Sequence, residues 1–148
     1  MCWLKACEPQ KKLWREETIM AIERINPSSL GQPGGYHHVV KDGKTVYLAG
    51  QVARDRDGKT VGVGDAAAQA EQVFRNIQAA LESVGSDLGH ILKMTTFMTH
   101  REDFPAYRAA RSKFLIDDDT LPASTLILCS GLADPDFRIE IEAVAAIP

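Results

Sequence analysis

The sequence predicts an α+β fold in which one mixed β-sheet carries two helices on one face. The first observation is the order of elements, which reads β-β-α-β-α-β-β along the chain. The second is the last strand, residues 137–146, where apolar and charged side chains alternate. The third is that residues 90–98 and 122–130 are apolar or Thr-rich on both faces and need cover on both. With both helices on one side, the other face stays apolar, which predicts an oligomer whose sheets pack inward.

The first two strands are expected at residues 36–41 and 45–51, because they flank the dipeptide Asp42-Gly43. That pair is a strong signal for a two-residue hairpin turn. The segment before it, residues 25–35, is expected to be extended and rich in turns. The segment after it, residues 53–64, reads as a polar loop.

A helix is predicted over residues 65–84, with Asp65 as N-cap and Gly85 as C-cap. Its apolar residues recur every three or four positions and form one face, made of Val73, Phe74, Ile77, Leu81 and Val84. The helix joins the hairpin to the strand at residues 90–98. A crossover of this kind is expected to be right-handed and to link parallel strands.

A second helix is predicted over residues 103–115, and two strands follow at residues 122–130 and 137–146. Residues 131–136 contain Gly, Asp and Pro and are expected to form the turn between these strands.

Length and composition describe one ordinary globular domain. The chain has 148 residues, 45% hydrophobic and 25% charged, with a formal net charge of −3. An acidic balance gives no general attraction to nucleic acid, so no such partner is expected. No apolar run approaches the roughly 20 residues that span a bilayer, so no membrane partner is expected. The three cysteines form no metal-like or disulfide-like framework, which suits a cytoplasmic protein.

Residues 1–19 stand apart from a single domain that we expect at residues 20–148. They mix Trp3 and Trp14 with charged residues and contain no continuous apolar region, so they are no secretory signal. One interpretation is a flexible extension or an upstream start codon, since Met20 opens a typical domain start. The other is a short helix whose two tryptophans dock on a partner.

Local motifs alone do not identify a chemistry. The sequence shows no nucleophile–base triad, metal cluster or phosphate-binding loop, and neither a cofactor nor a metal is expected. His37 and His38 are adjacent in a predicted strand, so their rings point to opposite faces and are poor joint ligands.

An ordered set of motifs nevertheless resembles the RidA family, also called the YjgF family. The matching stretches run from about residue 25 to the end: Gly35-Tyr36, Ala49-Gly50-Gln51-Val52, Gln69 to Val84, Val84-Gly85, Lys93 to Met98, Asp103-Phe104, Pro122-Ala123-Ser124-Thr125 and Ile139-Glu140-Ile141-Glu142-Ala143. The resemblance implies a chorismate mutase-like fold and a homotrimer with a central β-barrel. It also implies small-molecule clefts between subunits and hydrolysis of reactive enamines or imines to 2-oxo acids and ammonia.

The resemblance assigns roles to particular residues. Glu140 would position or activate the attacking water, Tyr36 would form an aromatic wall, and the backbone at Gly50 would help to hold the substrate. The family's carboxylate-binding Arg directly follows Pro-Ala, and in this sequence that position is Ser124. A short neutral hydroxyl cannot replace a guanidinium that makes two parallel hydrogen bonds to a carboxylate.

Several alternatives follow from this departure. Arg108, on the second predicted helix, is a candidate replacement for the missing cation, or it is an ordinary exposed Arg. Ser124 is either a strand-edge residue or a hydrogen-bonding group for a changed ligand. Glu140 is either catalytic or part of a salt-bridged strand face. The protein is thus either an imine or enamine hydrolase of altered specificity, or a non-catalytic trimer that binds a metabolite or a protein.

Overall fold

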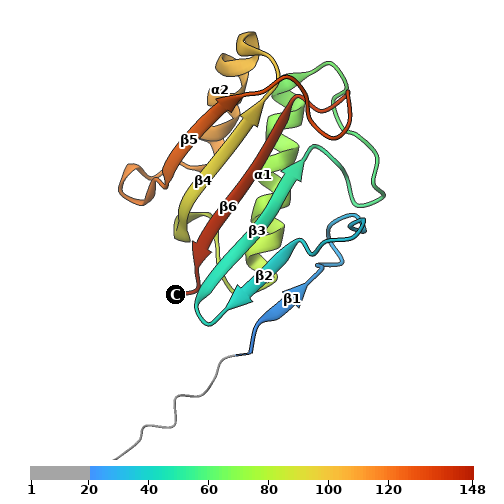
Figure 1. Ribbon diagram of the computed structural model, residues 1–148. Coiled ribbons are helices and arrows are strands. Elements are labelled where there is room, and N and C mark those ends of the chain that lie inside the picture. Colours follow the sequence, from blue (N-terminus) through green and yellow to red (C-terminus); the bar gives the residue numbers. More distant parts are fainter. Residues whose placement is uncertain (1–20) are drawn as a thin grey trace, which may run out of the picture.

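The computed structural model describes residues 21–148, so the predicted extension at residues 1–19 lies outside the described residues. Six strands form one mixed sheet in the order β1-β2-β3-β6-β4-β5, with both helices on one face (Figure 1). The predicted α+β class and the placement of the helices are confirmed. The elements are β1 (Glu23–Ile25), β2 (Val39–Asp42), β3 (Thr45–Val52), α1 (Ala66–Glu82), β4 (Ile91–Met98), α2 (Phe104–Phe114), β5 (Ala123–Leu128) and β6 (Ile139–Ala146).

The β2–β3 hairpin turns where the sequence predicts it. Asp42 pairs with Thr45, and Gly43 has a φ of 58°, a conformation that favours glycine. The first strand is shorter than predicted, because residues 36–38 precede β2. The short strand β1 was not predicted, because a three-residue strand with an exposed Glu23 and Arg24 carries no readable alternation.

Strand β6 lies between β3 and β4 and is antiparallel to both. The two strands joined by α1 are therefore parallel but not adjacent, whereas β4 and β5, joined by α2, are adjacent and parallel. The last two strands are separated in the sheet by β4, although only a loop separates them in sequence. Pairing of β3 with β6 is interrupted by a bulge between Leu48 and Gln51.

The core fills the space between the sheet and the helices. Asp65 caps α1 as predicted, accepting hydrogen bonds from Ala67 N (3.0 Å) and Ala68 N (3.1 Å). The apolar side of α1 is buried, and Phe74 stacks on Phe114 of α2 with ring centroids 5.4 Å apart. The strand residues that complete this core from β6 are Ile139, Ile141, Ala143 and Ala145.

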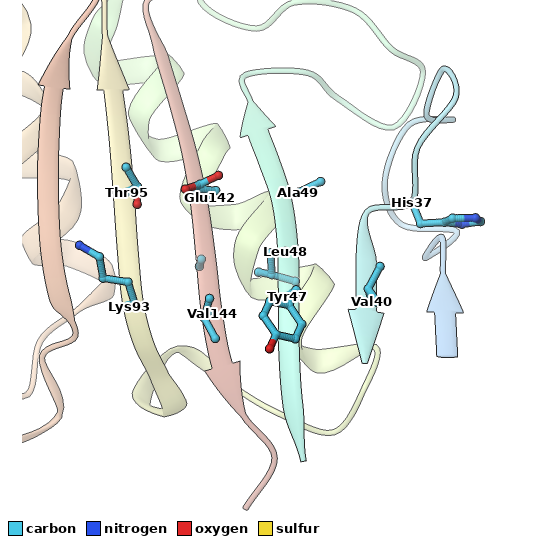
Figure 2. A pocket seen from close by; sticks show the side chains of 10 residues that line it. His37, Val40, Tyr47, Leu48, Ala49, Lys93, Thr95, Glu142 and Val144 are labelled. Carbon is cyan, nitrogen blue, oxygen red and sulfur yellow. The ribbon is translucent and has the colours of Figure 1, made fainter. Parts of the chain in front are cut away.

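No helix or strand of the described residues covers the opposite face of the sheet (Figure 1). It carries a shallow hollow of about 400 Å³ that runs across β2, β3, β6 and β4 (Figure 2). The side chains that Figure 2 labels there include Tyr47, Lys93, Thr95, Glu142 and Val144. Within residues 21–148, none of the helices has the length and apolar character needed to cross a membrane.

Candidate active site

A cavity of about 340 Å³ opens near the end of β3 and the start of β6. Three of the five residues predicted from the sequence line it together: Tyr36, Gly50 and Glu140. They come from three separate parts of the chain: the loop before β2, the bulge in β3 and the second residue of β6. The remaining lining residues are Ala49, Val52, Arg54, Ala133, Asp134 and Phe137.

Glu140 lies on the uncovered face of the sheet, paired with Val52 of β3 and Phe97 of β4. Its side chain is half-buried, and burial raises the pKa of its carboxyl, with a smaller contribution from the charge of Glu142. A carboxyl group with a raised pKa is a better proton acceptor for water than an ordinary surface glutamate. Its position is therefore suited to general acid–base chemistry.

Gly50 leaves room for that carboxyl group. A Cβ atom added to Gly50 would lie 2.8 Å from Cδ of Glu140 and would overlap its Oε1. The register of β3 against β6 shifts at this point, and Gly50 presents main chain rather than a side chain to the carboxyl group of Glu140.

Tyr36 forms an aromatic wall that is 48% exposed. Its ring meets His38 edge-on, with centroids 5.5 Å apart. His38 is buried and holds the preceding loop, because its Nε2 lies 2.8 Å from Gly31 O and its backbone N–H donates to Asn26 Oδ1 (3.0 Å). The turn-rich segment predicted at residues 25–35 thus positions the wall.

Arg54 is a lining residue that sequence reasoning missed. Its guanidinium lies 5.0 Å from the centroid of the Phe137 ring, and Nη2 lies 3.7 Å from Asp134 Oδ2. The sequence places Arg54 in the polar loop predicted at residues 53–64. An isolated antiparallel bridge between Arg54 and Thr60 holds that segment. The available signal was its position, only four residues beyond Gly50 at the exit of the same strand.

Gln69 of α1 is a second residue that was missed, and it holds the far wall of the cavity. Its fully buried amide donates to Gly62 O (3.1 Å) and Asp136 O (2.7 Å) and accepts from the backbone N–H of Arg138 (2.9 Å). These bonds tie the loop after β3 and the loop before β6 to one helix. Figure 1 shows these two loops at the same end of the sheet.

Ser124 and Arg108 lie elsewhere in the single chain. Ser124 is exposed on the edge strand β5, paired with Met94, and does not line the cavity. Arg108 is exposed on α2, with its guanidinium 5.8 Å from the centroid of the Phe104 ring. Phe104 lines a separate apolar groove of about 400 Å³ together with Met98, Leu126 and Leu128. Within one chain, the predicted site residues therefore divide into two groups.

Comparison with known proteins identifies the family. Residues 27–147 match the family described as Endoribonuclease L-PSP. A 2-iminobutanoate/2-iminopropanoate deaminase of Dermatophagoides farinae is 30% identical over 132 residues, covering 86% of this chain and 99% of the relative. The chain belongs to the Endoribonuclease L-PSP family, which is the RidA/YjgF family.

Solved structures agree with this assignment. The YjgF gene product of E. coli superposes with a TM-score of 0.78 at 29% identity, covering 85% of this chain and 99% of that one. TdcF of E. coli, solved with bound serine, gives 0.75 at 27% identity over 83% of this chain and 96% of that one. The resemblance seen in the ordered motifs is therefore confirmed.

Proposed function

We propose that this protein hydrolyses small reactive imines, and the enamines that tautomerise to them, in a cavity built around Glu140. The observation that carries the proposal is the half-buried carboxyl group of Glu140, which faces the cavity beside Gly50 and Tyr36. The naming of one relative as a 2-iminobutanoate/2-iminopropanoate deaminase supports the same reaction class.

The reaction needs one water and no external reductant or oxidant. Water adds to the C=N carbon: a C–O bond forms, the C=N π electrons move to nitrogen, and Glu140 passes a proton from the water to that nitrogen, which gives a carbinolamine. Glu140 then takes the hydroxyl proton and gives it to the amino nitrogen. The oxygen lone pair forms the C=O bond as the C–N bond breaks, so ammonia leaves and a carbonyl product remains. The raised pKa of Glu140 helps this exchange, because the carboxyl group then accepts a proton more readily and can still donate it in the next step.

We propose further that the specificity differs from that of relatives with Arg directly after Pro-Ala. Ser124 provides one hydroxyl where those relatives have a guanidinium. Losing a charge-assisted contact of that kind typically lowers transition-state binding by about a hundredfold. Substrate choice must then depend on other groups in the cavity.

The domain at residues 20–148 is proposed to assemble as a cytoplasmic homotrimer with a central β-barrel. The uncovered sheet face and the exposed apolar side chains of β5, Ile127 and Leu128, support burial against other copies. In such an assembly the edge that carries Ser124 and Arg108 would lie near the Glu140 cavity of a neighbouring copy, so the two groups of residues would form one cleft.

The second candidate function is a non-catalytic trimer that binds a metabolite or protein in the same clefts. The observation that favours it is Ser124 at the position of the usual Arg. A nuclease, as in the family's description, fits this chain poorly. A formal net charge of −3 and a carboxyl group in the cavity both disfavour a phosphate backbone.

The test is ammonia release from 2-iminobutanoate and 2-iminopropanoate generated in place by an amino-acid oxidase. The parent, Glu140→Gln and Ser124→Arg are compared at equal concentration. Turnover by the parent that Glu140→Gln lowers by about a hundredfold or more supports the hydrolase. Turnover by neither parent nor Ser124→Arg would overturn it in favour of a binding trimer.

A further inference from the structure

We infer that Arg54 binds the carboxylate of the substrate, so that the cation supplied in relatives from the Pro-Ala edge is supplied here from the exit of β3. The inference rests on the proposed function, and it adds the residue that would hold the anionic end of a 2-imino acid in this chain. None of the motifs that carry the family resemblance includes Arg54.

Arg54 lies in the cavity where a carboxylate-binding cation is needed. Arg54 lines the same cavity as Glu140 and Tyr36, and of the residues lining that cavity it alone is an Arg or Lys. Its main chain is fixed, because its N–H donates to Val52 O (2.8 Å) and its carbonyl accepts from Asn76 Nδ2 (2.9 Å). A guanidinium on a fixed backbone loses less freedom when it binds a ligand.

The guanidinium of Arg54 also has unused hydrogen-bonding capacity. The Arg54 side chain is 49% exposed, and its guanidinium lies over the Phe137 ring, a contact that orients the group while leaving its N–H edge free. The distance of 3.7 Å to Asp134 is too long for a hydrogen bond. Among residues 21–148 the Arg54 side chain makes no hydrogen bond, so its donors are available for a carboxylate fork.

The neighbouring basic groups are less suitable. Arg138 is committed: its Nε lies 2.7 Å from the buried Asp103, and its Nη1 donates to Gly64 O (3.2 Å). Lys93 contacts the Thr125 hydroxyl and lines the hollow on the sheet face instead. Arg54 is therefore the basic group in the described chain that faces the cavity with free donors.

The charges in the cavity match a zwitterion. Arg54 offers one positive group, while Asp134 and Glu140 offer acidic groups on the same lining. A 2-iminium carboxylate places its anion next to its cationic nitrogen. Arg54 and Glu140 line one cavity, so a small substrate held by its carboxylate on Arg54 would keep its C=N carbon in the cavity that contains Glu140. A neutral imine would leave the guanidinium unused.

The experiment measures binding of 2-oxobutanoate, the stable product, by calorimetry, together with KM and kcat for 2-iminobutanoate. The key variant is Arg54→Met, which keeps length and removes charge. Arg56→Met is the matched control, because Arg56 is an exposed Arg of the same loop and does not line the cavity. We expect Arg54→Met to weaken 2-oxobutanoate binding about tenfold or more and to raise KM similarly, with Arg56→Met unchanged.

Two further variants separate ligand binding from a structural role. Arg54→Lys keeps the charge but loses the fork, so its affinity should fall between the parent and Arg54→Met. Asp134→Asn removes a competing carboxylate and should tighten 2-oxobutanoate binding. If Arg54 and Asp134 had only a structural role, both Arg54→Met and Asp134→Asn would instead bind 2-oxobutanoate more weakly. The neutral 2-oxobutanamide should bind Arg54→Met and the parent equally.

The outcomes also distinguish this inference from the proposed function. An active parent with Arg54→Met equal to Arg56→Met would overturn the role of Arg54 and leave the hydrolase standing. A parent that binds 2-oxobutanoate through Arg54 without turnover would overturn the hydrolase and keep the carboxylate site. Failure of the parent to bind 2-oxobutanoate would overturn the Arg54 inference.

Discussion

At Gly50 the carboxyl group of Glu140 approaches the backbone so closely that a side chain on residue 50 would compete for the same space. A half-buried acid with a raised pKa is unfavourable for the folded state when it ionises, and such costs are common where a group serves chemistry. A substitution at Gly50 therefore tests the space beside the carboxyl group, and a substitution at Glu140 tests its charge.

Gly50→Ala should reduce activity without unfolding the protein. The added methyl overlaps Oε1 of Glu140, so the carboxyl group must swing away from the position where it would act on water. We expect kcat to fall by about tenfold or more, measured as ammonia release, while the melting temperature changes little. Gly131→Ala is the control, because a Cβ there meets nothing within 4 Å. Full activity in Gly50→Ala would contradict the placement of Glu140 in the reaction.

Glu140→Gln should be as stable as the parent at low pH and more stable at neutral pH. Because burial raises the pKa of Glu140, the folded state holds this proton more tightly than the unfolded chain does. Stability therefore falls as pH rises from the ordinary glutamate pKa of 4.5 through the raised value, and Gln avoids that loss. Melting curves at about pH 4 and about pH 7.5 test this, with the exposed Glu82→Gln as control. A parent–variant difference that does not grow with pH would contradict it.

At the scale of elements, α1 positions the cavity as well as filling the core. One buried side chain, Gln69, satisfies backbone groups of Gly62, Asp136 and Arg138 on two separate loops. These loops lead to the lining residues Arg54 and Phe137. The helix therefore couples core packing to the geometry of the site.

Gln69→Leu should destabilise the fold by about 2–4 kcal/mol, because it leaves two carbonyls and one N–H without their partner. The variant should also raise KM, since both walls lose their anchor. Gln78→Leu on the same helix is the control, because within residues 21–148 the Gln78 side chain bonds only to the exposed Glu82. Urea denaturation and steady-state kinetics measure the two effects. Equal stability of the two variants would contradict the anchoring role.

The sequence patterns predicted which segments form strands and helices better than they predicted which strands lie next to one another in the sheet. Alternation in residues 137–146 gave the faces of β6, and Asp42-Gly43 gave the hairpin, because both signals are local. Insertion of β6 between β3 and β4 depends on pairing between distant segments, which periodicity does not encode. Family motifs pointed to Glu140, Gly50 and Tyr36, which line one cavity, whereas the presence of Arg54 in that cavity depends on how a loop folds beside Phe137.

For the whole molecule, the uncovered sheet face raises the question of assembly. Tyr47 and Val144 lie exposed or half-exposed on that face, on adjacent strands β3 and β6 (Figure 2). The edge strand β5 adds Ile127, which is 40% exposed and shares this face, because it pairs with Phe97, the partner of Glu140. Exposed apolar side chains that gather on one sheet face mark an interaction surface, so burial between copies is the expected resolution.

Light scattering should give a mass three times the 16.2 kDa of one chain, and Val144→Asp should reduce it to that of one chain. In the proposed barrel every copy places Val144 on the buried sheet face, so three unpaired carboxylates would lose water there at several kcal/mol each. Val63→Asp is the control, because Val63 is 61% exposed in the loop after β3. Since the proposed cleft needs two copies, a monomeric Val144→Asp should also lose turnover. A monomeric parent would refute both the barrel and the shared cleft, and a trimeric Val144→Asp would show that copies meet through another surface.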